Sequence, residues 1–268
     1  MIAVARREIR GALWRLKRLI FSFGWDVHPF DPDRSIGTYL THLFLLLSID
    51  CVIDVGARNG EFGRLLREHG YRGRIISFEP VPTTFEHLQQ RAARDPLWDA
   101  YQVALGSENT LATINVMRSS EFSSFLAPID GSELNRAGWN AVVRQEQVPV
   151  RRLDDILPDI LPAGRSSRIY LKMDTQGWDL EVLRGAEQTL SRVQALQSEM
   201  SIIPIYDGSP PFSEALASLK QRGFAASAMF GVSRDPQQRL REFDCVMVRS
   251  DEPCTQLADT QLALDRHA

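Results

Sequence analysis

"CVIDVGARNGEFGRLLREHG", residues 51–70, has the clearest structural pattern in the sequence. A short apolar run over 51–55 predicts a buried strand, and a glycine turn follows it. Phe62, Leu65 and Leu66 then recur on one face of a predicted helix, which Gly70 ends. A strand, a glycine turn and a helix in this order are typical of a ligand-binding unit in an α/β sheet. The next question is which ligand the turn holds.

The rest of the chain alternates in the same way. Four further strands are expected, over 74–78, 100–105, 168–173 and 193–199, and four helices, over 35–47, 83–94, 180–190 and 212–221. Thr83 and Glu86 form a capping-box pattern. A two-residue period predicts strands over 113–117 and 148–153. Such alternation indicates a parallel sheet covered on both faces. The last strands, 224–230 and 243–248, have no helix between them and should form an antiparallel pair at one edge.

Composition places the chain among soluble globular proteins. It has 268 residues, of which 44% are hydrophobic and 24% charged, and a net charge of −3 that does not point to nucleic acid as a partner. Three unpatterned cysteines indicate a reducing compartment without a disulfide framework or a zinc site. No apolar run approaches the roughly 18 residues of a membrane span. Residues 1–24 lack a secretory signal, so a cytoplasmic protein is expected.

The N-terminal segment has a different character. Residues 1–23 carry six basic side chains and one acidic one, a local net charge of +5, with leucines at helical spacing. Such a helix can lie on an anionic membrane surface, here the inner face, or pack on its own domain with a solvated basic face; both readings stay open. We expect three parts: a basic helix and linker over 1–34, one α/β domain over 35–250, and a tail over 251–268.

The turn does not match either common phosphate-binding pattern. A P-loop has Lys and Ser or Thr after its last glycine, whereas Glu61 and Phe62 follow Gly60 here. A dinucleotide turn has the spacing G-x-G-x-x-G, whereas Gly56 and Gly60 are separated by three residues. Asp54 and Glu61 would also repel a pyrophosphate. The turn therefore favours a ligand that carries positive charge and no phosphate.

A further carboxylate, Glu79, ends the second predicted strand, 19 residues after Gly60. A carboxylate at this place can accept hydrogen bonds from both hydroxyls of a ribose. Together with the turn it favours S-adenosylmethionine, which carries an ammonium and a sulfonium but no phosphate. The alternative is that these are ordinary strand-to-helix turns with solvated acids.

Seven blocks of the sequence resemble the FkbM family of methyltransferases. In order they are "VIDVGARNGEFGRLL", "ISFEPVPTTFEHL", "VALGSENT", "VPVRRLDDIL", "YLKMDTQGWDLEVLRGA", "LQSEMSIIPIYDG" and "EFDCVMVR", between residues 50 and 249. The resemblance implies a class I methyltransferase fold, Rossmann-like, with a seven-stranded, mostly parallel sheet, an antiparallel last strand and helices on both faces. It also implies S-adenosylmethionine as cofactor and O-methylation of sugar or natural-product hydroxyls. Two positions depart from the family pattern: Arg58 replaces a small residue, and Gln176 replaces a frequent glutamate.

Carboxylates at the ends of two later strands are the candidates for catalysis. Asp174 ends the strand 168–173 among apolar neighbours, so burial should raise its pKa and suit it to act as a base. It could instead contact the methionine end of the cofactor or cap the next helix. Glu199 ends the following strand and should face the same cleft, as a base, an acceptor ligand or a structural group. Both could bind Mg²⁺, which stays open. Lys172 is a functional residue or a salt-bridged lysine.

The remaining candidates are contact residues. We expect the cofactor to contact Asp54, Gly56, Ala57, Asn59, Gly60, Glu79, Pro80, Ala104, Leu105 and Asp174. The acceptor surface should come from residues 119–128, 131–145 and 202–212, with Ser123, Ser124, Gln176, Trp178 and Tyr206 as contacts. The function expected is O-methylation of a small-molecule or glycan hydroxyl. The alternatives are a non-catalytic scaffold with this fold and a nicotinamide-dependent oxidoreductase.

Overall fold

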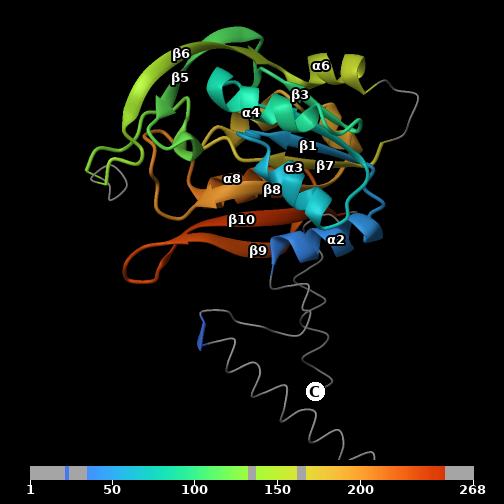
Figure 1. Ribbon diagram of the computed structural model, residues 1–268. Helices are drawn as coiled ribbons and strands as arrows, with labels where there is room; N and C mark the ends of the chain where they lie inside the picture. Colours follow the sequence, from blue (N-terminus) through green and yellow to red (C-terminus); the bar gives the residue numbers. More distant parts are fainter. Residues whose placement is uncertain (1–21, 24–34, 132–136, 162–166, 251–268) are drawn as a thin grey trace, which may run out of the picture.

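The structure is a computed structural model that describes residues 22–23, 35–131, 137–161 and 167–250. Most of the predicted basic helix and linker, and the whole predicted tail, therefore lie outside the described residues. The described chain forms a central sheet with helices on both faces and a second, smaller sheet (Figure 1). Within the described residues, no helix is both long and apolar enough to cross a membrane.

The central sheet has seven strands in the order β3-β2-β1-β7-β8-β10-β9. They are β1 (Cys51–Val55), β2 (Arg74–Phe78), β3 (Trp98–Tyr101), β7 (Ile169–Met173), β8 (Val193–Ser201), β9 (Phe224–Arg234) and β10 (Leu240–Arg249). β10 runs antiparallel to both of its neighbours, and the other pairs are parallel. The expected fold class, with an antiparallel last strand, is confirmed.

Side-chain alternation along the strands builds two apolar layers. On one face of the sheet, Ile53, Leu171 and Leu196 pack with α6 (Leu153–Ile160), α7 (Asp179–Arg184) and α8 (Phe212–Gln221). On the other face, Val52, Ile75 and Tyr170 pack with α2 (Ile36–Leu46), α3 (Glu61–Glu68) and α4 (Pro82–Ala92). Helices α3 and α4 lie in front of the sheet in Figure 1. β1 and β7 are buried at every position because helices cover both faces of the sheet. Their sequences are therefore apolar except at Asp54 and Lys172.

A second sheet of three strands, in the order β4-β6-β5, curves away from the central one (Figure 1). Its strands are β4 (Ala104–Leu105), β5 (Thr110–Met117) and β6 (Val142–Arg151). The expectation of one strand over 100–105 was wrong: β3 pairs with β2, whereas β4 pairs with β6. The chain thus changes sheets between Tyr101 and Ala104, at the edge where the site lies.

Two helix predictions also need correction. The helix expected over 180–190 stops at Arg184, with Gly185 as its C-cap, and a short 3₁₀ turn, η3 (Thr189–Arg192), follows. Gly185 lies so close to Gly106 that an added Cβ would stand 1.9 Å from its carbonyl oxygen, so no side chain fits at this position. The capping box at Thr83 and Glu86 is not formed, since α4 begins with Pro82 and has no side-chain cap. Asp174 does not cap a helix either, because the N-cap of α7 is Trp178.

Candidate functional site

A cavity of about 640 Å³ opens at the carboxyl ends of β1, β2 and β7. The turn after β1, the end of β2, β4, the end of β8 and the start of β10 form its walls, and the segment 120–125 borders it from the second sheet. Of the residues predicted to contact the cofactor, Gly56, Ala57, Glu79, Pro80, Ala104, Leu105 and Asp174 line the cavity, and Asp54, Asn59 and Gly60 do not. Parallel sheets bind ligands at this edge.

The glycines of the turn allow a close approach of two strand ends. Gly56 has a positive φ of 73°, and an added Cβ would lie 2.1 Å from the carbonyl oxygen of Asp174. Gly60 has a φ of 82° and is the N-cap of α3. Both positions need glycine because left-handed backbone is costly for residues with a Cβ. The turn therefore lies directly against the end of β7, which places cofactor and catalytic candidates side by side.

Glu79 is held by groups of its own chain. Its Oε2 accepts a hydrogen bond from the amide of Arg58 at 2.8 Å, and its Oε1 accepts from the amide of Val81 at 2.9 Å and from Thr84 Oγ1 at 2.8 Å. Burial raises the pKa of Glu79, and these three donors oppose that effect. A carboxylate has roughly four acceptor positions. Three are occupied, so the carboxylate is rigidly oriented and has room for about one further donor.

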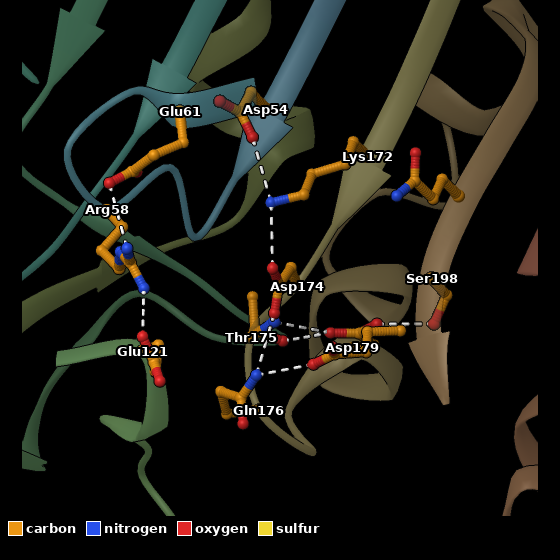
Figure 2. Close-up of polar contacts among 12 residues, drawn as sticks. Asp54, Arg58, Glu61, Glu121, Lys172, Asp174, Thr175, Gln176, Asp179 and Ser198 are labelled. Atoms are coloured by element: carbon orange, nitrogen blue, oxygen red, sulfur yellow. Dashed lines mark hydrogen bonds and ion pairs between the residues drawn. The ribbon is translucent and has the colours of Figure 1, made fainter. Parts of the chain in front are cut away.

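Arg58 joins the turn to the segment beside the second sheet. Its guanidinium contacts Glu61 at 3.1 Å and Glu121 of η2 (Ser120–Phe122) at 2.9 Å (Figure 2). Burial would raise the pKa of Glu61, but hydrogen bonds from Asn59 and Arg58 lower it. The charge of Glu61 is thus balanced within the protein, and the predicted attraction of Glu61 for a cationic ligand is weaker than expected. The departure at Arg58 has a structural role that sequence reasoning missed.

Lys172 lies between two carboxylates, 3.4 Å from Asp54 Oδ1 and 3.3 Å from Asp174 Oδ2 (Figure 2). Burial would lower the pKa of Lys172, but Asp174 and Asp54 raise it above its usual value, so it stays charged. Asp54 is fully buried and also accepts a hydrogen bond from Ser77 Oγ at 3.3 Å. The acid at the end of β1 is therefore part of an ion-pair row inside the protein, formed by Asp54, Lys172 and Asp174.

The pKa expected for Asp174 was wrong in direction. Burial would raise it, but the Lys172 ammonium and a hydrogen bond from Gln176 outweigh burial, so the pKa of Asp174 is lowered. The carboxyl with a strongly raised pKa is Glu199, because it is buried and faces the charge of Asp174 and two acids of β10. The two candidates thus differ in pKa: Asp174 favours the charged form, and Glu199 binds a proton more readily than an ordinary glutamate.

Glu242 and Asp244 are functional candidates that sequence reasoning missed. Both line the cavity from β10, and Asp244 pairs in register with Glu199 across the strands. Burial raises the pKa of Asp244 to about 6 and also raises that of Glu242. The signal was present in "LREFDCVMV", where two acids alternate with apolar residues in a buried strand.

Four of the five residues predicted to contact the acceptor line the cavity. Ser123, Ser124, Gln176 and Trp178 line it, whereas Tyr206 lies behind Gln176 in a separate cavity of about 30 Å³. The Ser124 hydroxyl donates to the carbonyl oxygen of Gln176 at 2.7 Å, and Trp178 packs against Phe125. Their roles toward an acceptor stay predictions.

The described residues contain no group of three or more His, Cys, Asp or Glu side chains arranged to hold a metal ion. Asp174 and Glu199 are joined instead through the amide of Gln176, at 3.0 and 2.6 Å. Two carboxylates and one amide offer oxygen and nitrogen atoms, but the amide nitrogen is a donor and cannot ligate a cation.

Comparison with known proteins identifies the domain. A family model described as "Methyltransferase FkbM domain" matches residues 54–225. The 2-O-methyltransferase NoeI of Sinorhizobium fredii is 24% identical over 239 residues, which cover 87% of this chain and 96% of that protein. Methyltransferase sdnD of Sordaria araneosa is 26% identical, covering 51% and 60% respectively. Among solved structures, the O-methyltransferase TomG of Streptomyces achromogenes in complex with SAM is 16% identical, with a TM-score of 0.45 and 89% of each chain covered.

Proposed function

The chain belongs to the family of FkbM-domain methyltransferases, and on that premise we propose that it transfers a methyl group from S-adenosylmethionine to a hydroxyl of a sugar, a glycan or a glycosylated natural product. One observation carries the proposal: Glu79, which follows β2, and Asp174 and Glu199, which lie at β7 and β8 beyond β1, line a single cavity. A carboxylate suited to a ribose and a candidate base thus border the same space.

The cofactor would lie along the turn after β1. The free acceptor position of Glu79 suits one ribose hydroxyl, and the apolar Ala104 and Leu105 suit a flat base. The charged Asp174 suits the ammonium of the methionine part, since opposite charges attract strongly in partly buried sites. The Arg58 guanidinium is already paired with two glutamates, which disfavours a pyrophosphate there.

S-adenosylmethionine supplies a methyl group that is already activated for displacement. The ionised form of Glu199, which is a stronger base because its pKa is raised, accepts the proton of the acceptor hydroxyl while the oxygen attacks the methyl group. The carbon–sulfur bond breaks as the carbon–oxygen bond forms, and the sulfur leaves as a neutral thioether. Holding the reactants in line contributes roughly 7–11 kcal/mol to lowering the barrier, and a general base adds about 10²–10⁴-fold.

The similarity to the 2-O-methyltransferase NoeI supports a hydroxyl as acceptor, and we propose a hydroxyl on a sugar ring. Ser123 and Trp178 border the cavity where such a ring would lie, and Trp178 offers an aromatic face of the kind on which sugars stack. The proposed transfer uses carboxylates alone. The version in which Asp174 and Glu199 hold Mg²⁺ differs in one measurable way, since EDTA would abolish its activity.

The cofactor is tested by calorimetry of the purified full chain with S-adenosylhomocysteine and with NAD. We expect micromolar binding of S-adenosylhomocysteine only, and its loss in Glu79→Ala. Transfer of a labelled methyl group to methyl glycosides with a free 2-hydroxyl, and not to their 2-deoxy counterparts, tests the acceptor, with EDTA in a parallel arm. Binding of neither cofactor would instead support a scaffold, and binding of NAD an oxidoreductase.

The N-terminal basic segment suggests where such an enzyme works. We propose that residues 1–24 bring the enzyme, on the cytoplasmic side, to an anionic membrane surface that carries lipid-linked glycans. Sedimentation with vesicles of anionic lipid should retain the full chain and not a variant lacking residues 1–24, and neutral vesicles should retain neither. Equal binding of both chains to anionic vesicles would refute this localisation.

A further inference from the structure

Gln176 connects the two carboxylates of the site. It follows β7 with a left-handed φ of 53°, which turns its side chain back toward the strand ends. Its Nε2 donates to Asp174 Oδ1 at 3.0 Å and to Glu199 Oε2 at 2.6 Å (Figure 2 shows it beside Asp174). Both hydrogens of the amide nitrogen are therefore used by groups of the protein.

The other end of the amide is fixed as well. Tyr206 is 2% exposed, and its single hydroxyl hydrogen is shared between Gln176 Oε1 at 2.8 Å and the carbonyl oxygen of Phe122 at 2.7 Å. The backbone of Gln176 is tied down by Ser124 Oγ, which donates to its carbonyl oxygen at 2.7 Å. A left-handed residue held at both ends of its side chain cannot easily rotate to meet an acceptor molecule.

Electrostatics makes a neutral donor valuable at this position. Glu199 faces Asp174 from β7 and the acids Glu242 and Asp244 from β10. Lys172 is within ion-pair distance of Asp174 and of Asp54, and none of the ion pairs among the described residues involves Glu199. A hydrogen bond to a charged carboxylate contributes about 1.5–3 kcal/mol. Gln176 can thus hold the Glu199 carboxylate in place without adding charge.

We propose that Gln176 is a positioning residue, locked by Tyr206, that sets the orientation of the Glu199 and Asp174 carboxylates, rather than a contact for the acceptor. The inference rests on the proposed function for its catalytic meaning. A glutamate here would bring a third carboxylate within hydrogen-bond distance of two others, and two protons would be needed among the three carboxyl groups to make both contacts.

The test follows the titration of Glu199 directly. Full-length protein labelled with ¹³C at the glutamate side-chain carboxyl is titrated by NMR, and Glu199→Gln identifies the signal. Gln176→Leu and Gln176→Glu should each raise the proton affinity of Glu199 by roughly tenfold or more, as expected for the loss of one hydrogen bond to a charged group. Gln147→Glu makes the same chemical change on the exposed part of β6 and should leave the signal unmoved.

Tyr206→Phe removes only a hydroxyl and keeps the test valid if the Gln176 variants fail to fold. It should move the Glu199 titration in the same direction by a smaller amount, and Gln176→Leu with Tyr206→Phe should move it no further than Gln176→Leu alone. An unmoved titration in Tyr206→Phe, or in a folded Gln176→Leu, would overturn the inference. Calorimetry with S-adenosylhomocysteine on the wild type separates the two claims: absent binding with a shifted titration refutes the proposed function and leaves the positioning role intact.

Discussion

The Nζ atom of Lys172 lies 3.4 Å from Oδ1 of Asp54, a side chain with no exposed surface. A lysine and an aspartate on neighbouring parallel strands are thus paired inside the sheet, at the same register position. Because Asp174 takes the second contact of the ammonium, one cation balances two acids. Removing that cation leaves the buried Asp54 and the partly exposed Asp174 without a counter-charge.

Lys172→Met should destabilise the protein by about 3–5 kcal/mol, the usual effect of breaking a buried ion pair. Urea denaturation measures the change, with Lys220→Met on the exposed face of α8 as the control. Adding Asp54→Asn to Lys172→Met should restore part of the loss, since it removes one of the unpaired charges. A Lys172→Met protein as stable as the wild type would contradict the ion-pair row.

Gly56→Ala should disrupt the turn after β1. The new Cβ would meet the carbonyl oxygen of Asp174 at 2.1 Å and would also sit at a φ of 73°. Gly70→Ala is the matched control, because it has a φ of 89° and nothing within 4 Å of the new Cβ. Both variants should lose stability, by more than about 1 kcal/mol for Gly56→Ala, and only Gly56→Ala should lose binding of S-adenosylhomocysteine. Equal behaviour of the two in thermal melts and calorimetry would argue against the close approach.

Arg58→Ala should affect the cofactor more than the fold. The Arg58–Glu121 pair has side chains 33% and 45% exposed, and pairs of this exposure contribute about 0–1 kcal/mol to stability. Arg74–Asp99 has nearly the same exposure, 34% and 40%, and lies outside the cavity. We expect similar small losses in melting temperature for Arg58→Ala and Arg74→Ala. Faster dissociation of S-adenosylhomocysteine in stopped-flow should occur only in Arg58→Ala.

Asp244→Asn should change how stability depends on pH. The pKa of Asp244 is about 6 in the folded protein because of burial, against roughly 3.9 in an unfolded chain. The folded state therefore binds this proton more tightly, and the contribution is full below pH 4 and lost as pH rises to 6. The variant should lack this decline and be more stable than the wild type at pH 7, by on the order of 2 kcal/mol.

Thermal melts between pH 4 and pH 7 check this expectation, since they span the pKa of about 6. Asp159→Asn, on the exposed side of α6, is the control and should follow the wild-type profile. A profile for Asp244→Asn that falls in parallel with the wild type would show that another group carries the decline.

Local sequence patterns determined most of the fold. The apolar runs of β1 and β7 are long enough only for buried strands, and the positions of Gly56 and Gly60 require a turn between strand and helix. The absence of a helix before β10 also indicated the antiparallel edge. These features depend on residues close together in the chain, where backbone geometry and burial periodicity leave few alternatives. Glu79 could be placed at the cavity for the same reason.

The charge states of the carboxyl groups and their partners depend on contacts between strands that are distant in the chain. The apolar neighbours of Asp174 predicted a base with a raised pKa, but Lys172 and Gln176 lower the pKa of Asp174. The carboxyl group whose pKa is raised is that of Glu199. The change of sheet after Tyr101 depends on pairing with β6, some 45 residues away in the chain. A pKa is the sum of burial and of charges from several strands, and those distances exist only once the sheet has formed.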